Sequence, residues 1–203
     1  VVCGSIEDKG ENVDIPVGTK VIGIPPIGGF AEFVAINKNL VIPVSENFSS
    51  LAGASLPINY GTSYYALKRR ANAQSGESLL VLGASGGIGT ASIQLAKVMG
   101  LRTICAVGSE DKAEYVKSLG GDEIVRYDQV DLKETVKEVT DGKGVDIVID
   151  PVGGEVSEQA LRATAFNGRL LVIGFANGQI PKISLNLTLV KGVSLVGVWW
   201  GRW

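Results

Sequence analysis

One run of small residues has the types and spacing that could bind a phosphate group: Gly83-Ala84-Ser85-Gly86-Gly87-Ile88-Gly89. It lies between an apolar segment and a helical pattern. A strand that turns tightly into a helix needs small residues to bend, to bring the backbone close to a pyrophosphate and to pack helix on strand. Unpaired N–H groups at the helix start then bind the phosphates. Ala84 replaces the usual first glycine, giving A-x-G-x-x-G. The strand-turn-helix setting predicts a dinucleotide site rather than a merely flexible loop.

The end of the next apolar segment, Val107-Gly108-Ser109, indicates which dinucleotide binds. NAD sites usually place Asp or Glu there, about 20 residues past the glycines, to hold the ribose 2′-OH. This chain has no carboxylate at that place, and Glu110 and Asp111 follow slightly later. The Ser109 hydroxyl and the Lys112 ammonium suit a 2′-phosphate better, which predicts NADPH. The alternative is that Ser109 only caps a helix and Lys112 is only surface charge.

Two further loops of small residues, 150–154 and 174–178, follow later apolar segments. Ligands of open α/β sheets bind at the carboxyl ends of strands, where small residues and exposed backbone would suit a flat nicotinamide. Asp150 begins the first loop, and it could equally be a helix cap, which is the more frequent role of Asp after a strand.

Alternating apolar segments and helical patterns from residue 78 onward must position these loops. We expect strands over 78–82, 102–107, 123–127, 145–149, 169–173 and 193–200, with a turn at Asn167-Gly168 before the fifth. Crossover helices between parallel strands cover both faces of the sheet. The pattern therefore predicts an α/β fold with a doubly wound, parallel, six-stranded Rossmann sheet.

The first residues show a different pattern. Short strands are expected over 20–24, 30–36 and 40–44, and a helical pattern over 49–71 in which Pro57 divides two short helices. Such a small β unit buries too little surface to be a complete domain. We therefore divide the chain into a partial β domain, 1–48, and a dinucleotide-binding domain with its leading helices, 49–203.

Composition excludes several classes of protein. The net charge of 19 − 21 = −2 is not concentrated in blocks, so no nucleic-acid partner is evident. No apolar run approaches the roughly 20 residues that a membrane span requires. The chain has no histidine and two cysteines, Cys3 and Cys105, which supply neither a catalytic nor a structural zinc site. We therefore expect no metal site, and we expect Cys105 to be buried strand filler.

The motifs in combination resemble a known family. Besides the segments above, Gly28-Gly29-Phe30-Ala31-Glu32, Leu56-Pro57 and Tyr60-Gly61-Thr62-Ser63-Tyr64 match it in order and spacing. The chain resembles the zinc-independent NADPH:quinone oxidoreductases and zeta-crystallins of the medium-chain dehydrogenase/reductase superfamily, over essentially all of its length. That resemblance implies a GroES-like catalytic domain, split by an inserted cofactor domain.

The resemblance also implies roles for individual residues. The pyrophosphate would lie on Ala84, Ser85, Gly86, Gly87 and Ile88. The 2′-phosphate would be surrounded by Ser109, Lys112 and Tyr127. The nicotinamide would be approached by Thr62 and lined by Val152, Phe175, Ala176, Asn177, Trp199 and Trp200. The reaction implied is hydride transfer from NADPH to a quinone or to the β-carbon of an α,β-unsaturated carbonyl, without metal.

Relative to that family, the chain lacks both ends of the catalytic domain, including the C-terminal return into it. We therefore name no catalytic residue; Tyr60 and Tyr64 could donate a proton by their chemistry, but core packing is favoured for both. We expect these 203 residues alone to show no turnover. The full-length protein is expected to be a homodimer in the cytoplasm, with mitochondria as the alternative. The competing function is a non-catalytic, cofactor-binding structural or interaction protein of the zeta-crystallin type.

Overall fold

The computed structural model describes residues 1–202, and the chain divides into two compact units, Val1–Asn59 and Tyr60–Trp203. The boundary lies inside helix α1 (Ser50–Tyr64). The division into domains at 48/49 stays a prediction. Each unit is described by itself below.

The first unit contains a small antiparallel sheet in the order β1-β2-β3. Its strands are β1 (Val2–Ser5), β2 (Lys20–Gly23) and β3 (Val41–Pro43), followed in the chain by α1 and preceded at β3 by the short 3-10 helix η1 (Lys38–Leu40). Cys3 pairs with Ile22, and Ile22 pairs with Ile42. This sheet fits part of a GroES-like β domain, as expected.

The strand expected over 30–36 is wrong, because this segment has no regular secondary structure. Phe30 and Phe33 are exposed, and no described strand lies beside them to complete a ladder of backbone hydrogen bonds. Alternating apolar residues form a strand only where a neighbouring strand and a packing surface are available.

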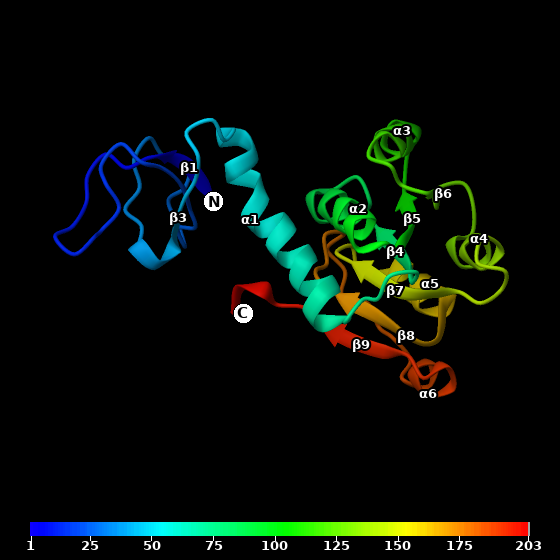
Figure 1. Ribbon diagram of the computed structural model, residues 1–203. Coiled ribbons are helices and arrows are strands. Elements are labelled where there is room, and N and C mark those ends of the chain that lie inside the picture. Colours follow the sequence, from blue (N-terminus) through cyan, green and yellow to red (C-terminus); the bar gives the residue numbers. More distant parts are fainter. Residues whose placement is uncertain (203) are drawn as a thin grey trace. The chain divides into compact units, whose positions relative to one another are not determined.

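The predicted break at Pro57 is also wrong. Helix α1 runs through Pro57 and continues into the π-helix η2 (Tyr65–Arg70), as the continuous coil in Figure 1 shows. Proline removes one backbone donor from the helix. Side chains in the adjacent turns bond to other carbonyls: Ser55 Oγ donates to Leu51 O at 3.0 Å, and Asn59 Nδ2 donates to Ser55 O at 3.0 Å. The turns on either side of Pro57 thus carry additional side-chain hydrogen bonds.

The second unit is built on the predicted parallel sheet of six strands, in the order β6-β5-β4-β7-β8-β9. The strands are β4 (Ser78–Leu82), β5 (Arg102–Val107), β6 (Glu123–Arg126), β7 (Val145–Asp150), β8 (Thr164–Val172) and β9 (Ser194–Gly197). The helices are α2 (Gly87–Met99), α3 (Glu110–Ser118), α4 (Leu132–Glu138), α5 (Glu155–Ala163) and α6 (Asn186–Lys191). The direction of winding reverses between β4 and β7, which is where open α/β sheets bind ligands (Figure 1).

Both faces of this sheet are covered. Leu79 and Val81 of β4 pack in a cluster with residues of α2 and α3, whereas Leu80 and Leu82 pack in a second cluster with residues of α4 and α5. A strand buried on both faces is apolar at every position, which is why continuous apolar runs mark these strands in the sequence. Cys105 is fully buried in the first cluster, as predicted, and burial raises the pKa of its thiol to about 12.

The last third of the sheet differs in detail from expectation. The predicted turn at Asn167-Gly168 is a bulge inside β8, where Asn167 has φ 62° and the pairing with β7 changes register. Strand β9 ends at Gly197, before the tryptophans, and the 3-10 helix η3 (Trp200–Arg202) follows. Helix α6 was not expected from the sequence.

An ion pair lies in the second unit, at the end of the sheet opposite the glycine turn. Arg169 donates from Nη1 and Nη2 to the two carboxylate oxygens of Glu77, at 2.7 and 2.8 Å, and from Nε to Ala71 O at 3.0 Å. Both charged side chains are mostly buried. The hydrogen bonds from Arg169 lower the pKa of Glu77 below its ordinary value of 4.5.

Replacing Glu77 with Gln is expected to lower the free energy of unfolding by about 1–3 kcal/mol at neutral pH, because Arg169 loses a charged, two-pronged partner. The folded-state pKa of Glu77 is depressed, so its stabilising effect is present above pH 4.5 and is lost as the pH falls through the folded pKa. Chemical denaturation across this range should show the variant and the parent converging in acid. Glu123→Gln, in an exposed pair with Arg102, is the control and should cost less than about 1 kcal/mol. A Glu77→Gln deficit independent of pH would contradict the assignment.

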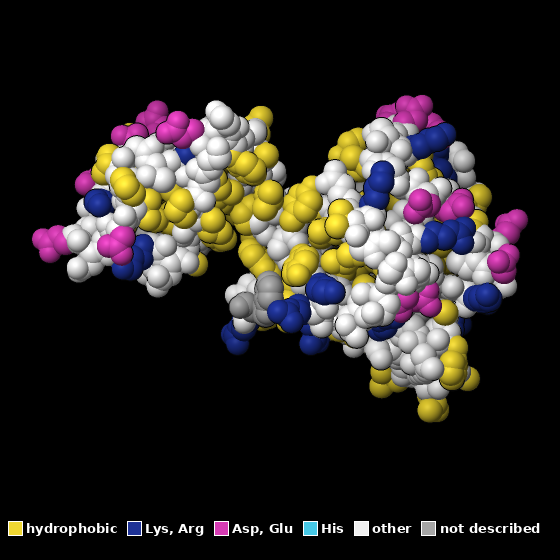
Figure 2. All heavy atoms as spheres, viewed as in Figure 1, with side chains coloured by type: hydrophobic (Ala, Val, Ile, Leu, Met, Phe, Trp, Pro, Cys, Tyr) yellow, Lys and Arg dark blue, Asp and Glu magenta, His cyan; other side chains and the backbone are white. Residues whose placement is uncertain are grey.

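Among residues 1–202, no helix is long and apolar enough to cross a membrane. On the face drawn in Figure 2, basic and acidic side chains are interspersed over the second unit.

Candidate cofactor-binding site

The turn between β4 and α2 is shaped by four glycines. Gly83 has φ 58°, in the left-handed region that side chains disfavour, and it makes the bend. Gly86 is the N-cap residue of α2, and Gly86 and Gly87 are exposed. A Cβ on Gly89 would lie 2.5 Å from the carbonyl oxygens of both Gly83 and Ala84, so only glycine permits this approach of helix to turn.

Ala84 contributes its backbone and not its side chain to this turn. The side chain is fully buried in the core, and the N–H donates to Ala106 O at 3.2 Å. Ala84 holds the first position of the motif, and the bend is made by Gly83, one residue earlier. The first N–H groups of α2 have no acceptor within the helix and, beside exposed glycines, form a surface for an anion.

Two buried serines place the segment around Thr62 beside the start of α2. Ser63 Oγ donates to Ile88 O at 3.2 Å, and Ser92 Oγ donates to Ile88 O at 2.7 Å and to Ser63 Oγ at 3.1 Å. Thr62 itself is half-buried. The structure thus brings the helix that carries Thr62 next to the helix that carries the glycine turn.

The loop after β7 is held by Asp150, whose side chain is 2% exposed. Its carboxylate accepts hydrogen bonds from the N–H groups of Val152 and Gly153, both at 2.9 Å, and from the hydroxyl of Ser157. The N-cap residue of α5 is Gly154, so Asp150 fixes the loop and the first turn of α5 without being the cap residue. Val152 lies against the glycine turn, since a Cβ on Gly83 would be 2.9 Å from Val152 Cγ2.

The loop after β8 is hydrogen-bonded to the loop after β7. Asn177 donates from its backbone to Val152 O at 3.0 Å and from Nδ2 to Gly153 O at 3.1 Å. Phe175 lies beside Gly153, where a Cβ would be 3.0 Å from the phenyl ring. The residues expected at the nicotinamide end from these two loops, Val152 and Phe175 to Asn177, therefore do lie together, next to the glycine turn.

The two tryptophans at the end of the described chain differ. The Trp200 indole lies against α1, where a Cβ on Gly61 would be 2.6 Å from it, so Trp200 and the neighbour of Thr62 are in contact. Trp199 is 69% exposed, with the Arg202 guanidinium 5.1 Å from its ring centroid. Trp203 lies outside the described residues.

The proposed 2′-phosphate residues lie at the ends of β5 and β6. Ser109 is the N-cap residue of α3, but its side chain makes no capping hydrogen bond. The Tyr127 ring lies over Gly108, where a Cβ would be 3.1 Å from the tyrosine hydroxyl. Lys112 is exposed in the first turn of α3. Tyr127 thus lies against Gly108, the residue before Ser109, whereas the Lys112 side chain extends from the surface of α3.

Arg126 is a charged residue that sequence reasoning missed at this place. It pairs with Val107 across β5 and β6, and its guanidinium binds Asp128 through Nε at 2.8 Å and Nη2 at 2.7 Å. Its Nη1 donates to Glu110. The hydrogen bonds from Arg126 lower the pKa of Asp128. The pairing of β5 with β6 brings Arg126 to Glu110, which is 16 residues away in the chain, so spacing in the sequence gives little signal of this contact.

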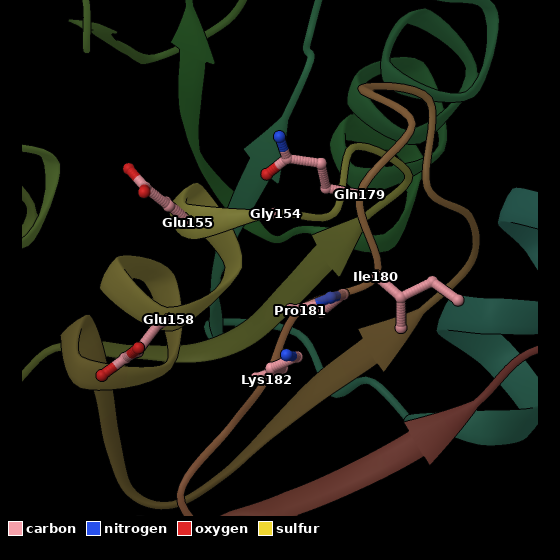
Figure 3. Close-up of a pocket in the computed structure, with 7 residues that line it drawn as sticks. All are labelled: Gly154, Glu155, Glu158, Gln179, Ile180, Pro181 and Lys182. Carbon is pink, nitrogen blue, oxygen red and sulfur yellow. The ribbon is translucent and has the colours of Figure 1, made fainter.

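A separate cavity of about 450 Å³ lies between the start of α5 and the segment that follows Asn177 (Figure 3). Its lining residues are Gly154, Glu155, Glu158, Gln179, Ile180, Pro181 and Lys182. Neither the glycine turn nor Ser109 contributes to it. No group of three or more His, Cys, Asp or Glu side chains in residues 1–202 could hold a metal ion.

Comparison with known proteins identifies the class. The model of the zinc-binding dehydrogenase family matches residues 87–203, more than half of the chain, and the chain belongs to this family, within the medium-chain dehydrogenase/reductase superfamily. Several of the relatives it resembles are named quinone oxidoreductases or quinone oxidoreductase-like proteins. Quinone oxidoreductase-like protein 2 of Bos taurus is 38% identical over 202 residues, which are 98% of this chain and 58% of that protein.

Solved structures agree with this placement. The Escherichia coli quinone oxidoreductase complexed with NADPH has a TM-score of 0.91 and 25% identity, covering 98% of this chain and 62% of that chain. The CurK enoyl reductase has a TM-score of 0.87 and 30% identity, covering 98% and 60%. The chain thus spans about three fifths of the length of these relatives.

Proposed function

We propose that the glycine turn between β4 and α2 binds the pyrophosphate of NADPH, and that the longer protein transfers a hydride from NADPH to a quinone or an α,β-unsaturated carbonyl. The observation that carries the proposal is the close approach of Gly89 to the turn, together with exposed Gly86 and Gly87. Side chains at these positions would fill the cradle or push the helix away. The quinone oxidoreductase complexed with NADPH supports the choice of cofactor.

The remaining contacts follow from the same placement. The N–H groups of Gly87 and Ile88 face the pyrophosphate. Ser109 and Tyr127, with Lys112 able to reach them, bind the 2′-phosphate. The nicotinamide lies between Thr62 with Trp200 and the hydrogen-bonded loops of Val152 and Phe175 to Asn177. The two loops are mutually hydrogen-bonded and next to the glycine turn, which supports a rigid wall at this end.

The substrate class is proposed from chemistry and from relatives. NADPH supplies a hydride, and a quinone or an enone accepts it at a conjugated position and takes a proton to complete the reduction. The related structures include a quinone oxidoreductase and an enoyl reductase. We assign no proton donor. Tyr60 donates to Gln94, and Tyr64 is 41% exposed, so the core packing expected for Tyr64 is wrong.

The protein is expected to bind NADPH at least about tenfold more tightly than NADH, because a charged contact to the 2′-phosphate contributes about 1.5–3 kcal/mol. Fluorescence titration of both cofactors measures this. Lys112→Glu should remove most of the preference, whereas Lys117→Glu, in the last turn of the same helix, should leave it unchanged. Equal affinities for the two cofactors, or an unchanged preference in Lys112→Glu, would be incompatible with this site.

The proposed substrate is a small molecule, and the full-length protein is proposed to be a homodimer in the cytoplasm. These remain predictions that a sedimentation measurement and localisation of the tagged protein can check.

A further inference from the structure

Glu110 is the first carboxylate in the chain after the strand end at which NAD-binding sheets hold the ribose 2′-OH. It is the first residue of α3 and directly follows Ser109. Its side chain is 71% exposed, so it has room to reach a cofactor at the end of β5. A carboxylate in that position accepts a hydrogen bond from the 2′-OH and repels a 2′-phosphate. A chain that prefers NADPH must therefore keep the Glu110 carboxylate bound to another group.

In this structure, Arg126 is the group that binds the Glu110 carboxylate. The Arg126 side chain is only 17% exposed, and Asp128 fixes the plane of its guanidinium through two parallel hydrogen bonds. The remaining nitrogen, Nη1, donates to Glu110. Because Arg126 lies opposite Val107 in the sheet, this pair forms beside the end of β5, where the adenosine ribose is proposed to lie.

We infer that Arg126 determines cofactor specificity by holding the Glu110 carboxylate away from the ribose, and that its loss would convert this edge of the site toward NAD binding. This inference rests on the proposed function. Lys112 and Ser109 would attract the 2′-phosphate, and Arg126 would suppress the competing acceptor. The two effects are separable, since only the second depends on Glu110.

The test is a double-mutant cycle in the full-length protein, with 2′,5′-ADP and 5′-AMP titrated by calorimetry as probes for the two ribose types. Arg126→Leu is expected to lower the preference for 2′,5′-ADP about tenfold or more. Arg126→Leu with Glu110→Gln should restore the preference to within about threefold of the parent, and Glu110→Gln alone should leave it within the same limits. Arg102→Leu removes an exposed pair at the other end of β5 and should change nothing.

Two results would overturn the inference. An unchanged preference in Arg126→Leu would show that Glu110 does not compete for the ribose. A preference that stays lost in the double variant would show that Arg126 itself contacts the phosphate. If Arg126→Leu does not fold by circular dichroism, Arg126→Gln takes its place in the same cycle. A parent protein that binds neither probe would defeat the proposed function itself, which distinguishes that failure from failure of this inference.

Discussion

Replacing Gly86 with valine is expected to weaken NADPH binding at least about 100-fold while changing the free energy of unfolding by no more than about 1 kcal/mol. Gly86 is exposed, and its φ of −78° suits any residue. A Cβ there would lie 3.3 Å from Gly83 O, a tight contact that a shift of the turn by a few tenths of an ångström relieves, so we expect the fold to persist. The isopropyl group would, however, occupy the surface where backbone N–H groups meet the pyrophosphate.

Gly89→Val is the matched comparison. Its Cβ would lie 2.5 Å from two backbone oxygens, so α2 must move away from the turn. We expect this variant to lose cofactor binding and also about 3 kcal/mol or more of stability. NADPH titration and chemical denaturation of both variants give the two quantities. Normal NADPH binding by Gly86→Val would mean that the phosphates bind elsewhere.

The second large effect is expected from Asp150→Ala, which should lower the free energy of unfolding by about 3 kcal/mol. The buried carboxylate accepts three hydrogen bonds, and its removal leaves the N–H groups of Val152 and Gly153 and the hydroxyl of Ser157 without this acceptor. The loop that carries Val152 would loosen, so NADPH affinity should fall as well.

Ser157→Ala is the control, because it removes one of the three donors and keeps the carboxylate bonded to the loop. It should cost about 1 kcal/mol and leave cofactor affinity nearly unchanged. Thermal unfolding and NADPH titration of Asp150→Ala and Ser157→Ala measure the two effects. An Asp150→Ala variant as stable as Ser157→Ala would show that the loop does not depend on this carboxylate.

The parallel sheet could be predicted from the sequence because strands buried on both faces leave continuous apolar runs. Local patterns were insufficient where tertiary contacts decide the outcome. The segment 30–36 has strand-like residues but no described strand beside it. Pro57 would break an isolated helix, yet α1 continues through it. The bulge at Asn167 depends on how β8 pairs with β7, which no local pattern contains.

The candidate site, like the fold, could be predicted where its residues are continuous in sequence and not where they come from distant segments. The glycine turn is continuous in sequence, so its residues and setting could be recognised directly. The role of Gly83 in the bend, and the contact of Trp200 with Gly61, depend on backbone angles and on packing between distant segments. The pairing of Arg126 with Glu110 follows from strand register. Residues whose roles depend on contacts with distant segments are therefore the ones that could not be predicted from the sequence.

The most direct test of the central claim is turnover by the full-length protein, followed as oxidation of NADPH in the presence of a panel of quinones and α,β-unsaturated carbonyls. We predict oxidation with at least one of these acceptors, unaffected by a chelator and without stoichiometric zinc in the purified protein, and no turnover by these 203 residues alone. NADPH binding without oxidation by any acceptor would contradict the account and favour the non-catalytic, cofactor-binding alternative.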